Sequence, residues 1–141
     1  MLPTYGVSPP GDVAGAMHWG LVSCSPDTSL RDVAALMAEA RVHCIVVIDD
    51  PFDAHPPWGV VSDLDLVAAA TVRPLAEQNA GGTAMRPALT AFPHEPVSAA
   101  AERMTRHNIS HLVVVDPLRR HPVGVLSTLD LIRSFTDAPP T

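Results

Sequence analysis

The sequence contains no lysine. Its 141 residues include nine basic ones, all arginine, and fifteen acidic ones, which give a formal net charge of −6. Without lysine there can be neither a phosphate-binding loop that ends in lysine nor a Schiff-base nucleophile. Nucleic-acid binding depends on clustered positive charge, so DNA and RNA are not expected as partners.

Cysteine is scarce, and long apolar runs are missing. Cys24 and Cys44 are too few and too irregularly placed for a disulfide framework. The amino terminus has neither the basic start nor the unbroken apolar stretch of a secretory signal. No run approaches the roughly 20 apolar residues of a membrane span. The sequence therefore predicts a cytoplasmic protein that does not cross a membrane.

Signatures of catalytic and metal sites are also missing. Ser62 lacks the glycine two residues later that a nucleophile elbow requires, and no His-Glu-x-x-His pair is present, so we expect no enzyme activity. A metal site is a weaker hypothesis, based on His43-Cys44 together with His18 and Cys24. Their spacing matches no common zinc pattern, and a cysteine beside a buried strand usually belongs to the core, so no metal is expected.

The sequence does contain a repeat. Residues 59–67 (GVVSDLDLV) return as residues 124–132 (GVLSTLDLI), with glycine, serine, aspartate and leucine in the same places. Upstream, the apolar runs 44–49 and 111–116 also correspond. Matching apolar positions ahead of those runs are 67 residues apart, as from Leu30 to Val97. Such self-similarity predicts two like halves that pack together.

The halves are expected at residues 13–71 and 83–135, joined by a linker at 72–82 and flanked by tails at 1–12 and 136–141. With 47% hydrophobic residues, the chain has enough apolar surface for one compact module. Each half is predicted to follow the order strand, helix, strand, strand, helix. In the first half these elements are expected at 21–24, 30–41, 45–48 and 58–61, with a helix opened by Ser62. In the second they are expected at 89–92, from Pro96 to 107, at 112–115 and 123–126, with a helix opened by Ser127.

These features resemble the cystathionine β-synthase (CBS) domain, two of which in tandem form a Bateman module. The resemblance covers nearly the whole chain. It rests on Met17 and Met85 opening the halves, on strands that end in Asp49 and Asp116, and on the Gly-hydrophobic-hydrophobic-Ser-x-x-Asp motif. It implies an α/β fold of two pseudo-symmetric repeats, with clefts between the repeats that hold AMP, ADP, ATP or S-adenosylmethionine. It also implies an energy-sensing or other regulatory role, exerted on a partner protein in trans.

The motif chemistry suits such a ligand. An aspartate can accept hydrogen bonds from both ribose hydroxyls, which assigns the ribose to Asp65 and Asp130. Serines at helix starts favour an anion, which assigns the phosphate to Ser62 and Ser127. Four apolar residues of the same motifs are candidates to line the base: Val60, Val61, Val125 and Leu126.

Histidines flank the motifs. His43 stands where relatives that bind phosphorylated ligands commonly place a basic residue, whereas the matching position is Ser110. His111, one residue further on, is a candidate substitute, and a structural role for each histidine at a strand end remains an equal alternative. His18 and Arg86 are further candidates for binding phosphate charge.

Leucine precedes the motif aspartate in both halves, as Leu64 and Leu129. Relatives that bind nucleotides strongly often carry a basic or polar residue there. This departure weakens the case for ATP and leaves adenosine, AMP or a sulfonium-bearing adenosyl compound compatible.

Two alternatives stay open. Ser-x-x-Asp is also the spacing of a helix capping box, so the motifs could be structural. The whole module could also be a ligand-free interaction or dimerisation protein. Resemblance to stand-alone CBS pairs implies a homodimer, with Trp58, the Pro-rich loop before it and the helices opened by Ser62 and Ser127 as candidate contact surfaces.

Overall fold

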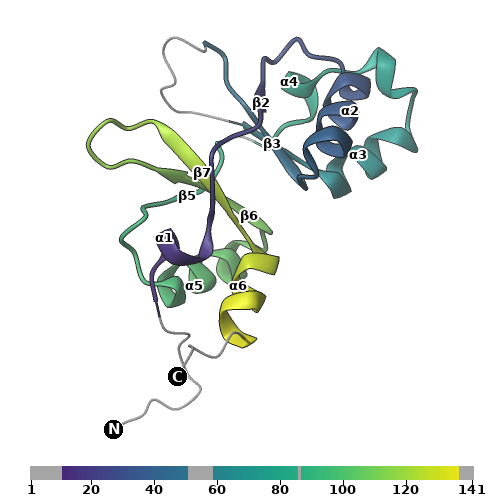
Figure 1. Ribbon diagram of the computed structural model, residues 1–141. Helices are drawn as coiled ribbons and strands as arrows, with labels where there is room; N and C mark the ends of the chain where they lie inside the picture. Colours follow the sequence, from purple (N-terminus) through teal and green to yellow (C-terminus); the bar gives the residue numbers. More distant parts are fainter. Residues whose placement is uncertain (1–10, 51–58, 86, 137–141) are drawn as a thin grey trace, which may run out of the picture. The chain divides into compact units, whose positions relative to one another are not determined.

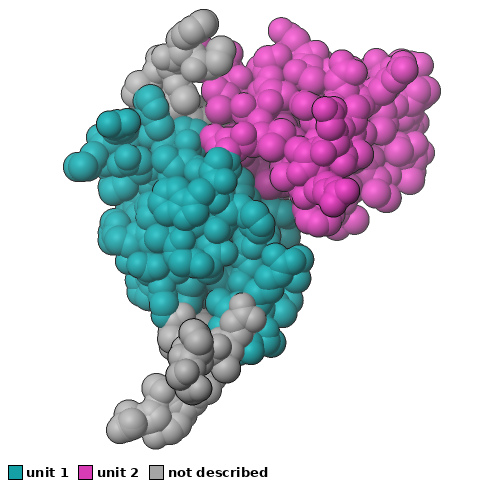
Figure 2. Space-filling view, in the orientation of Figure 1, with its two compact units in different colours: residues 1–20, 89–141 teal, residues 21–88 magenta. Residues whose placement is uncertain are grey.

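The computed structural model describes residues 11–50, 59–85 and 87–136. These residues belong to two compact units (Figure 2). Unit 1 comprises residues 1–20 and 89–141, and unit 2 comprises residues 21–88. Trp58 and residues 51–57 of the Pro-rich loop lie outside the described residues. Within the described ranges, no helix has the length and apolar character of a membrane span.

Unit 2 has a three-stranded sheet in the order β2-β3-β4, formed by Ser23–Cys24, Cys44–Val47 and Gly59–Ser62. β2 and β3 are parallel, and β3 and β4 are antiparallel. Its helical elements are α2 (Leu30–Ala40), α3 (Asp63–Ala70), the 3-10 turn η1 (Leu75–Glu77) and α4 (Ala80–Thr83). The core lies between sheet and helices and contains Leu30, Val33, Ile45, Val61 and Leu66.

Unit 1 has a four-stranded sheet in the order β1-β7-β6-β5, formed by His18–Trp19, Pro122–Ser127, His111–Val115 and Thr90–Ala91. Only β5 and β6 are parallel. The helices α1 (Val13–Ala16), α5 (Val97–His107) and α6 (Thr128–Thr136) lie together beside this sheet (Figure 1). The core contains Val13, Val97, Met104, Leu112 and Leu126.

The predicted order of strand, helix, strand, strand, helix is confirmed in both sequence repeats. The first long helix of each repeat has apolar residues on one side, and these are buried in the core. Arg41 and Asn108, 67 positions apart, end these helices in the left-handed conformation, with φ of 57° and 52°. Such a residue lets the chain turn back toward the sheet, so the same local signal ends the helix in both repeats.

The short helices α1 and α4 were not predicted. Because of where they pack, the two compact units do not coincide with the two sequence repeats. α1 lies at the start of the expected first half, 13–71, but packs in unit 1, where the amide of Val13 donates to the carbonyl of Glu95 (2.8 Å). α4 lies at the end of the expected linker 72–82 but packs in unit 2, where the amide of Ala80 donates to the carbonyl of Thr28 (2.8 Å). Val13 and Ala80 are fully buried. Each unit therefore takes its opening helix from the segment directly before the strand, helix, strand, strand, helix series of the other unit.

Strand register corrects one pairing of residues. Met17 and Met85 were matched as the residues that open the two halves, but His18 pairs with Val125 whereas Met85 pairs with Val60. Val60 and Val125 are equivalent in the motif, so Met85 is the counterpart of His18. Met17 is buried, whereas Met85 is 50% exposed. The offset of 67 residues continues through these segments, and the match of the two methionines is shifted by one residue.

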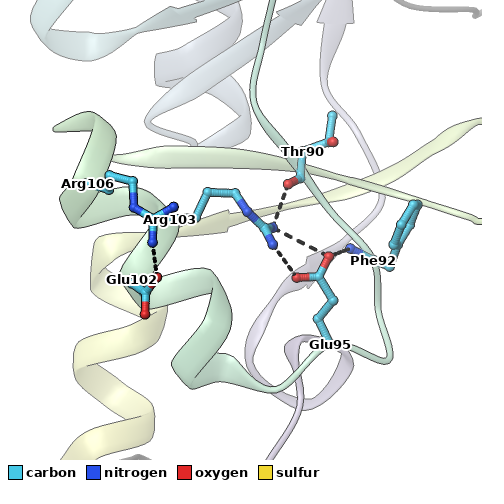
Figure 3. A network of polar contacts seen from close by, with 6 residues as sticks. All are labelled: Thr90, Phe92, Glu95, Glu102, Arg103 and Arg106. Carbon is cyan, nitrogen blue, oxygen red and sulfur yellow. Dashed lines mark hydrogen bonds and ion pairs between the residues drawn. The ribbon is translucent and has the colours of Figure 1, made fainter.

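A polar network holds the turn that receives α1 (Figure 3). Arg103 of α5 pairs with the carboxylate of Glu95 (2.8 Å) and donates to the carbonyl of Thr90 (2.8 Å). The same carboxylate accepts from the amide of Phe92 (3.0 Å). Since the carbonyl of Glu95 also accepts from Val13, the ion pair orders the loop on which α1 docks.

Candidate functional site

Ser62 and Ser127 stand at equivalent helix starts. At α3, the hydroxyl of Ser62 accepts from the amide of Asp65 (3.2 Å), and the Asp65 carboxylate accepts from the amide of Ser62 (2.8 Å). At α6, Ser127 and Asp130 make the same two hydrogen bonds, at 3.1 and 2.8 Å. The capping-box hypothesis is therefore confirmed for both motifs. Each capping box uses only Oδ2 of the aspartate. Oδ1 is therefore the oxygen whose surroundings decide whether the aspartate can also accept from a ligand.

The two Oδ1 atoms have different surroundings. Oδ1 of Asp65 accepts no hydrogen bond from any described residue, and the side chain is half-buried. Oδ1 of Asp130 lies 3.0 Å from Nδ1 of His18, and the Asp130 side chain is 3% exposed. The first motif thus offers an acceptor that no described residue uses, whereas the acceptor of the second is engaged by an exposed imidazole. The motif spacing assigned both aspartates to ribose and gave no sign of this difference.

The first turn of α3 has little to offer a phosphate. The amide of Asp63 donates to the carbonyl of His43 (2.9 Å), and the amide of Leu64 donates to Oδ1 of Asp63 (2.8 Å). With the Asp65 amide bound to Ser62, all three amides have acceptors within the chain. Two carboxylates, Asp63 and Asp65, also lie in this turn. Repulsion from these two carboxylates disfavours a highly charged ligand at α3, because it opposes the attraction that a helix start usually has for anions.

The apolar motif residues divide between two faces of each sheet. Val61 and Leu126 are completely buried and belong to the cores of units 2 and 1. Because side chains alternate along a strand, Val60 and Val125 lie on the opposite face from these two. Val60 is 9% exposed and Val125 is half-buried. A ligand could contact Val60 and Val125 without opening a core, whereas contact with Val61 or Leu126 would need the core to open.

The candidate histidines are engaged with neighbouring side chains. Nδ1 of His43 lies 3.0 Å from Asp63, and both side chains are more than half exposed. His111 pairs directly across the ladder with Ser127, and its Nδ1 lies 2.8 Å from the hydroxyl of Ser110. The two histidines are therefore not equivalent in position. Arg86 lies outside the described residues.

The residues considered for a metal site are divided between the two units, His18 in unit 1 and Cys24, His43 and Cys44 in unit 2. Residues 11–50, 59–85 and 87–136 contain no cluster of three or more His, Cys, Asp or Glu side chains that could hold a metal ion. Burial raises the pKa of the Cys24 thiol, opposed in part by a hydrogen bond with Thr28, and a raised pKa disfavours the thiolate that binds metal.

Comparison with known proteins decides the family. The model of the CBS domain matches residues 11–71 and 82–137, which is most of the chain. The chain belongs to the CBS-domain family. Its two matched segments are a tandem CBS pair, as the sequence repeat predicted.

Solved structures show the same fold. A CBS domain protein from Pyrobaculum aerophilum, in complex with AMP, is 33% identical to this CBS pair, with a TM-score of 0.75; the match covers 85% of this chain and 89% of the other. The CBS domain pair of protein MJ0100, in complex with 5-methylthioadenosine and S-adenosyl-L-methionine, is 22% identical, with a TM-score of 0.77; the match covers 90% and 97% of the two chains.

One curated relative is an enzyme. A homoserine O-acetyltransferase from Methanococcoides burtonii is 40% identical over 122 residues, which cover 86% of this CBS pair. The match spans only 23% of the length of that protein. The likeness is thus limited to a minor part of the enzyme.

Proposed function

We propose that this CBS pair is a non-catalytic regulatory module that binds an adenosine-containing ligand and acts on a partner protein in trans. The observation that carries the proposal is Oδ1 of Asp65, which accepts from no described residue and lies beside the cap of α3, at a spacing from Ser62 that recurs in the second repeat. It is supported by the AMP complex of the relative that is 33% identical. Ser62, Asp65 and Val60, and their counterparts Ser127, Asp130 and Val125, are the proposed contacts.

The crowded first turn of α3 narrows the ligand class. Asp63 and Asp65 add two negative charges there, and His43 balances only the first of them when it is protonated. Adenosine, AMP or S-adenosylmethionine fits such a turn better than ATP, because each places fewer negative charges near the carboxylates. His43 and His111 are then the candidates for contact with a single phosphate.

Removing the charge of Asp65 should weaken binding. Asp65→Asn retains an oxygen to accept from the Ser62 amide but presents an amide group, in place of Oδ1, to the ribose. Loss of a charged acceptor costs about 1.5–3 kcal/mol, which is roughly tenfold or more in the dissociation constant of AMP, measured by calorimetry.

Asp63→Asn is the matched control, since it removes a neighbouring carboxylate that the proposal does not assign to ribose. The affinity of the Asp63→Asn variant for AMP should stay equal to that of the wild type or rise.

A ligand screen on the wild-type protein tests the proposal as a whole. If adenosine, AMP, ADP, ATP and S-adenosylmethionine all fail to shift the melting curve at millimolar concentration, the ligand proposal is wrong. A ligand at one hundred times its dissociation constant stabilises a fold by about 2.7 kcal/mol, so binding would be visible.

Exposed apolar residues favour a second function, self-association. Leu64 and Val67 of α3 are 73% and 63% exposed, and their counterparts Leu129 and Ile132 of α6 are 43% and 53% exposed. Residues three positions apart share a helix face, so each helix presents an apolar stripe. The same face recurs on both helices, as expected for a surface that a second copy covers.

We expect light scattering at micromolar concentration to report a homodimer, of about twice the chain mass of 14.9 kDa. Val67→Glu with Ile132→Glu should shift the protein toward the monomer, because each places a charge on an apolar stripe. Leu118→Glu is the control, since Leu118 is 92% exposed but lies outside both helices. A wild-type monomer across the concentration range would contradict the dimer.

A further inference from the structure

The two Ser-x-x-Asp motifs share their capping geometry but not their access to ligand. In unit 1 both oxygens of Asp130 are engaged, Oδ2 by the amide of Ser127 (2.8 Å) and Oδ1 by His18 (3.0 Å). In unit 2 the capping amide of Ser62 engages Oδ2 of Asp65, and Oδ1 accepts from no described residue.

The difference comes from one pair of equivalent residues. His18 is held beside the second motif because β1 pairs with β7, in a register that sets His18 opposite Val125. The equivalent bridge in unit 2 sets Met85 opposite Val60, with hydrogen bonds of 3.0 and 3.2 Å between their backbones. A histidine nitrogen can donate to a carboxylate, whereas the methionine thioether has no donor. An antiparallel backbone pair is thus present beside both motifs, and it carries histidine at one and methionine at the other.

We propose that His18 makes the two ligand sites unequal: the Ser62–Asp65 motif binds adenosine ligands tightly, and His18 competes with the ribose at Asp130. This inference rests on the function proposed above. A ribose that approaches Asp130 must displace the imidazole and uncover a side chain that is 3% exposed. The His18 side chain is 70% exposed, so solvent surrounds most of it and nothing in the described part of unit 1 besides Asp130 pairs with the ring. The imidazole therefore has room to leave, which makes the second motif a weaker site rather than a closed one.

The experiment exchanges the two residues. Calorimetry with AMP, and in parallel with adenosine, should show one tight site per wild-type chain. His18→Met gives the second motif the side chain of the first, and it should produce a second tight site, with an affinity gain on the order of tenfold at that motif. Met85→His should weaken the wild-type tight site by a similar factor. In the double exchange the tight site should move, so that Asp130→Asn rather than Asp65→Asn removes it.

A loss of binding must be distinguished from a loss of folding. Circular dichroism and thermal melting check that each variant is folded, and His18→Ala replaces His18→Met if the latter does not fold. Two sites of equal affinity in the wild type, or binding unchanged by both exchanges, overturns the inference and leaves the proposed function standing. Absence of binding of AMP and adenosine in the wild type and in both single variants overturns this inference, and the proposed function falls with it only if ADP, ATP and S-adenosylmethionine also fail to bind.

Discussion

Replacing Leu126 with alanine should lower the free energy of unfolding by about 2–5 kcal/mol, because truncation of a fully buried leucine removes apolar contacts and leaves a cavity. Leu126 has no exposed surface and lies in the core of unit 1 with Val13, Leu112 and Leu131. Urea unfolding measures the loss, and hydrogen exchange at the amides of β6 and β7 should locate it in unit 1.

Val125→Ala is the matched control for Leu126→Ala. Val125 is the preceding residue of β7, half-buried on the opposite face of the sheet, and its truncation should cost about 1 kcal/mol or less. The motif pattern did not separate these two residues, since both were candidates for contact with the base. If both variants lost similar stability, or if Leu126→Ala stayed fully stable, the assignment of Leu126 to the core would be wrong.

Replacing Gly124 with alanine should cost about 1–3 kcal/mol, as overpacking of a close contact does. A Cβ at Gly124 would lie far inside the van der Waals distance of the carbonyl oxygen of His18 and of the Met17 side chain. The pairing of β1 with β7 would have to shift to admit it. Thermal unfolding measures the cost, and exchange at the amide of Gly20, which donates to the carbonyl of Val123 (2.8 Å), reports whether β1 has detached.

Gly15→Ala is the control for Gly124→Ala. Gly15 lies in α1 of the same amino-terminal segment, and a Cβ there would meet only Oδ1 of Asp12, at an ordinary 3.5 Å. Alanine favours a helix over glycine by up to about 1 kcal/mol, so the variant should be as stable as the wild type or slightly more so. An equal loss of stability in both glycine variants would contradict the role of Gly124 in strand packing.

Local patterns predicted most elements correctly, because their causes are local. The apolar spacing of Leu30, Val33 and Met37 set one buried helix face, and the same spacing recurred from Val97 to Met104. Ser62 and Ser127 were placed at helix starts by the spacing to their aspartates, and both make the capping box. The short elements α1, β1 and α4 escaped prediction, since two to four residues carry too little periodicity.

The arrangement of the motif residues was predicted in part. Sequence spacing brought serine and aspartate together in each motif. The alternation of side chains along a strand is a further local signal, and it is enough to separate Val60 from Val61 and Val125 from Leu126. The contact between His18 and Asp130 has no such local cause. It depends on a strand pairing between residues more than one hundred positions apart, and the shifted match of Met17 with Met85 concealed which residue stands in place of His18.

The sequence by itself determined that the chain has two like halves, the order of their strands and helices, and the caps that start the helices, because these follow from spacing within short segments. Only the tertiary structure decided which segments pack together. Equivalent residues make equivalent hydrogen bonds, Val13 with Glu95 and Ala80 with Thr28, so these bonds do not distinguish the two opening helices. The repeat leaves that choice open, since it specifies which residues correspond and not which copy they join. The packing of the amino-terminal segment in unit 1 puts His18, rather than a methionine, beside Asp130. The difference between the two motifs follows from that contact.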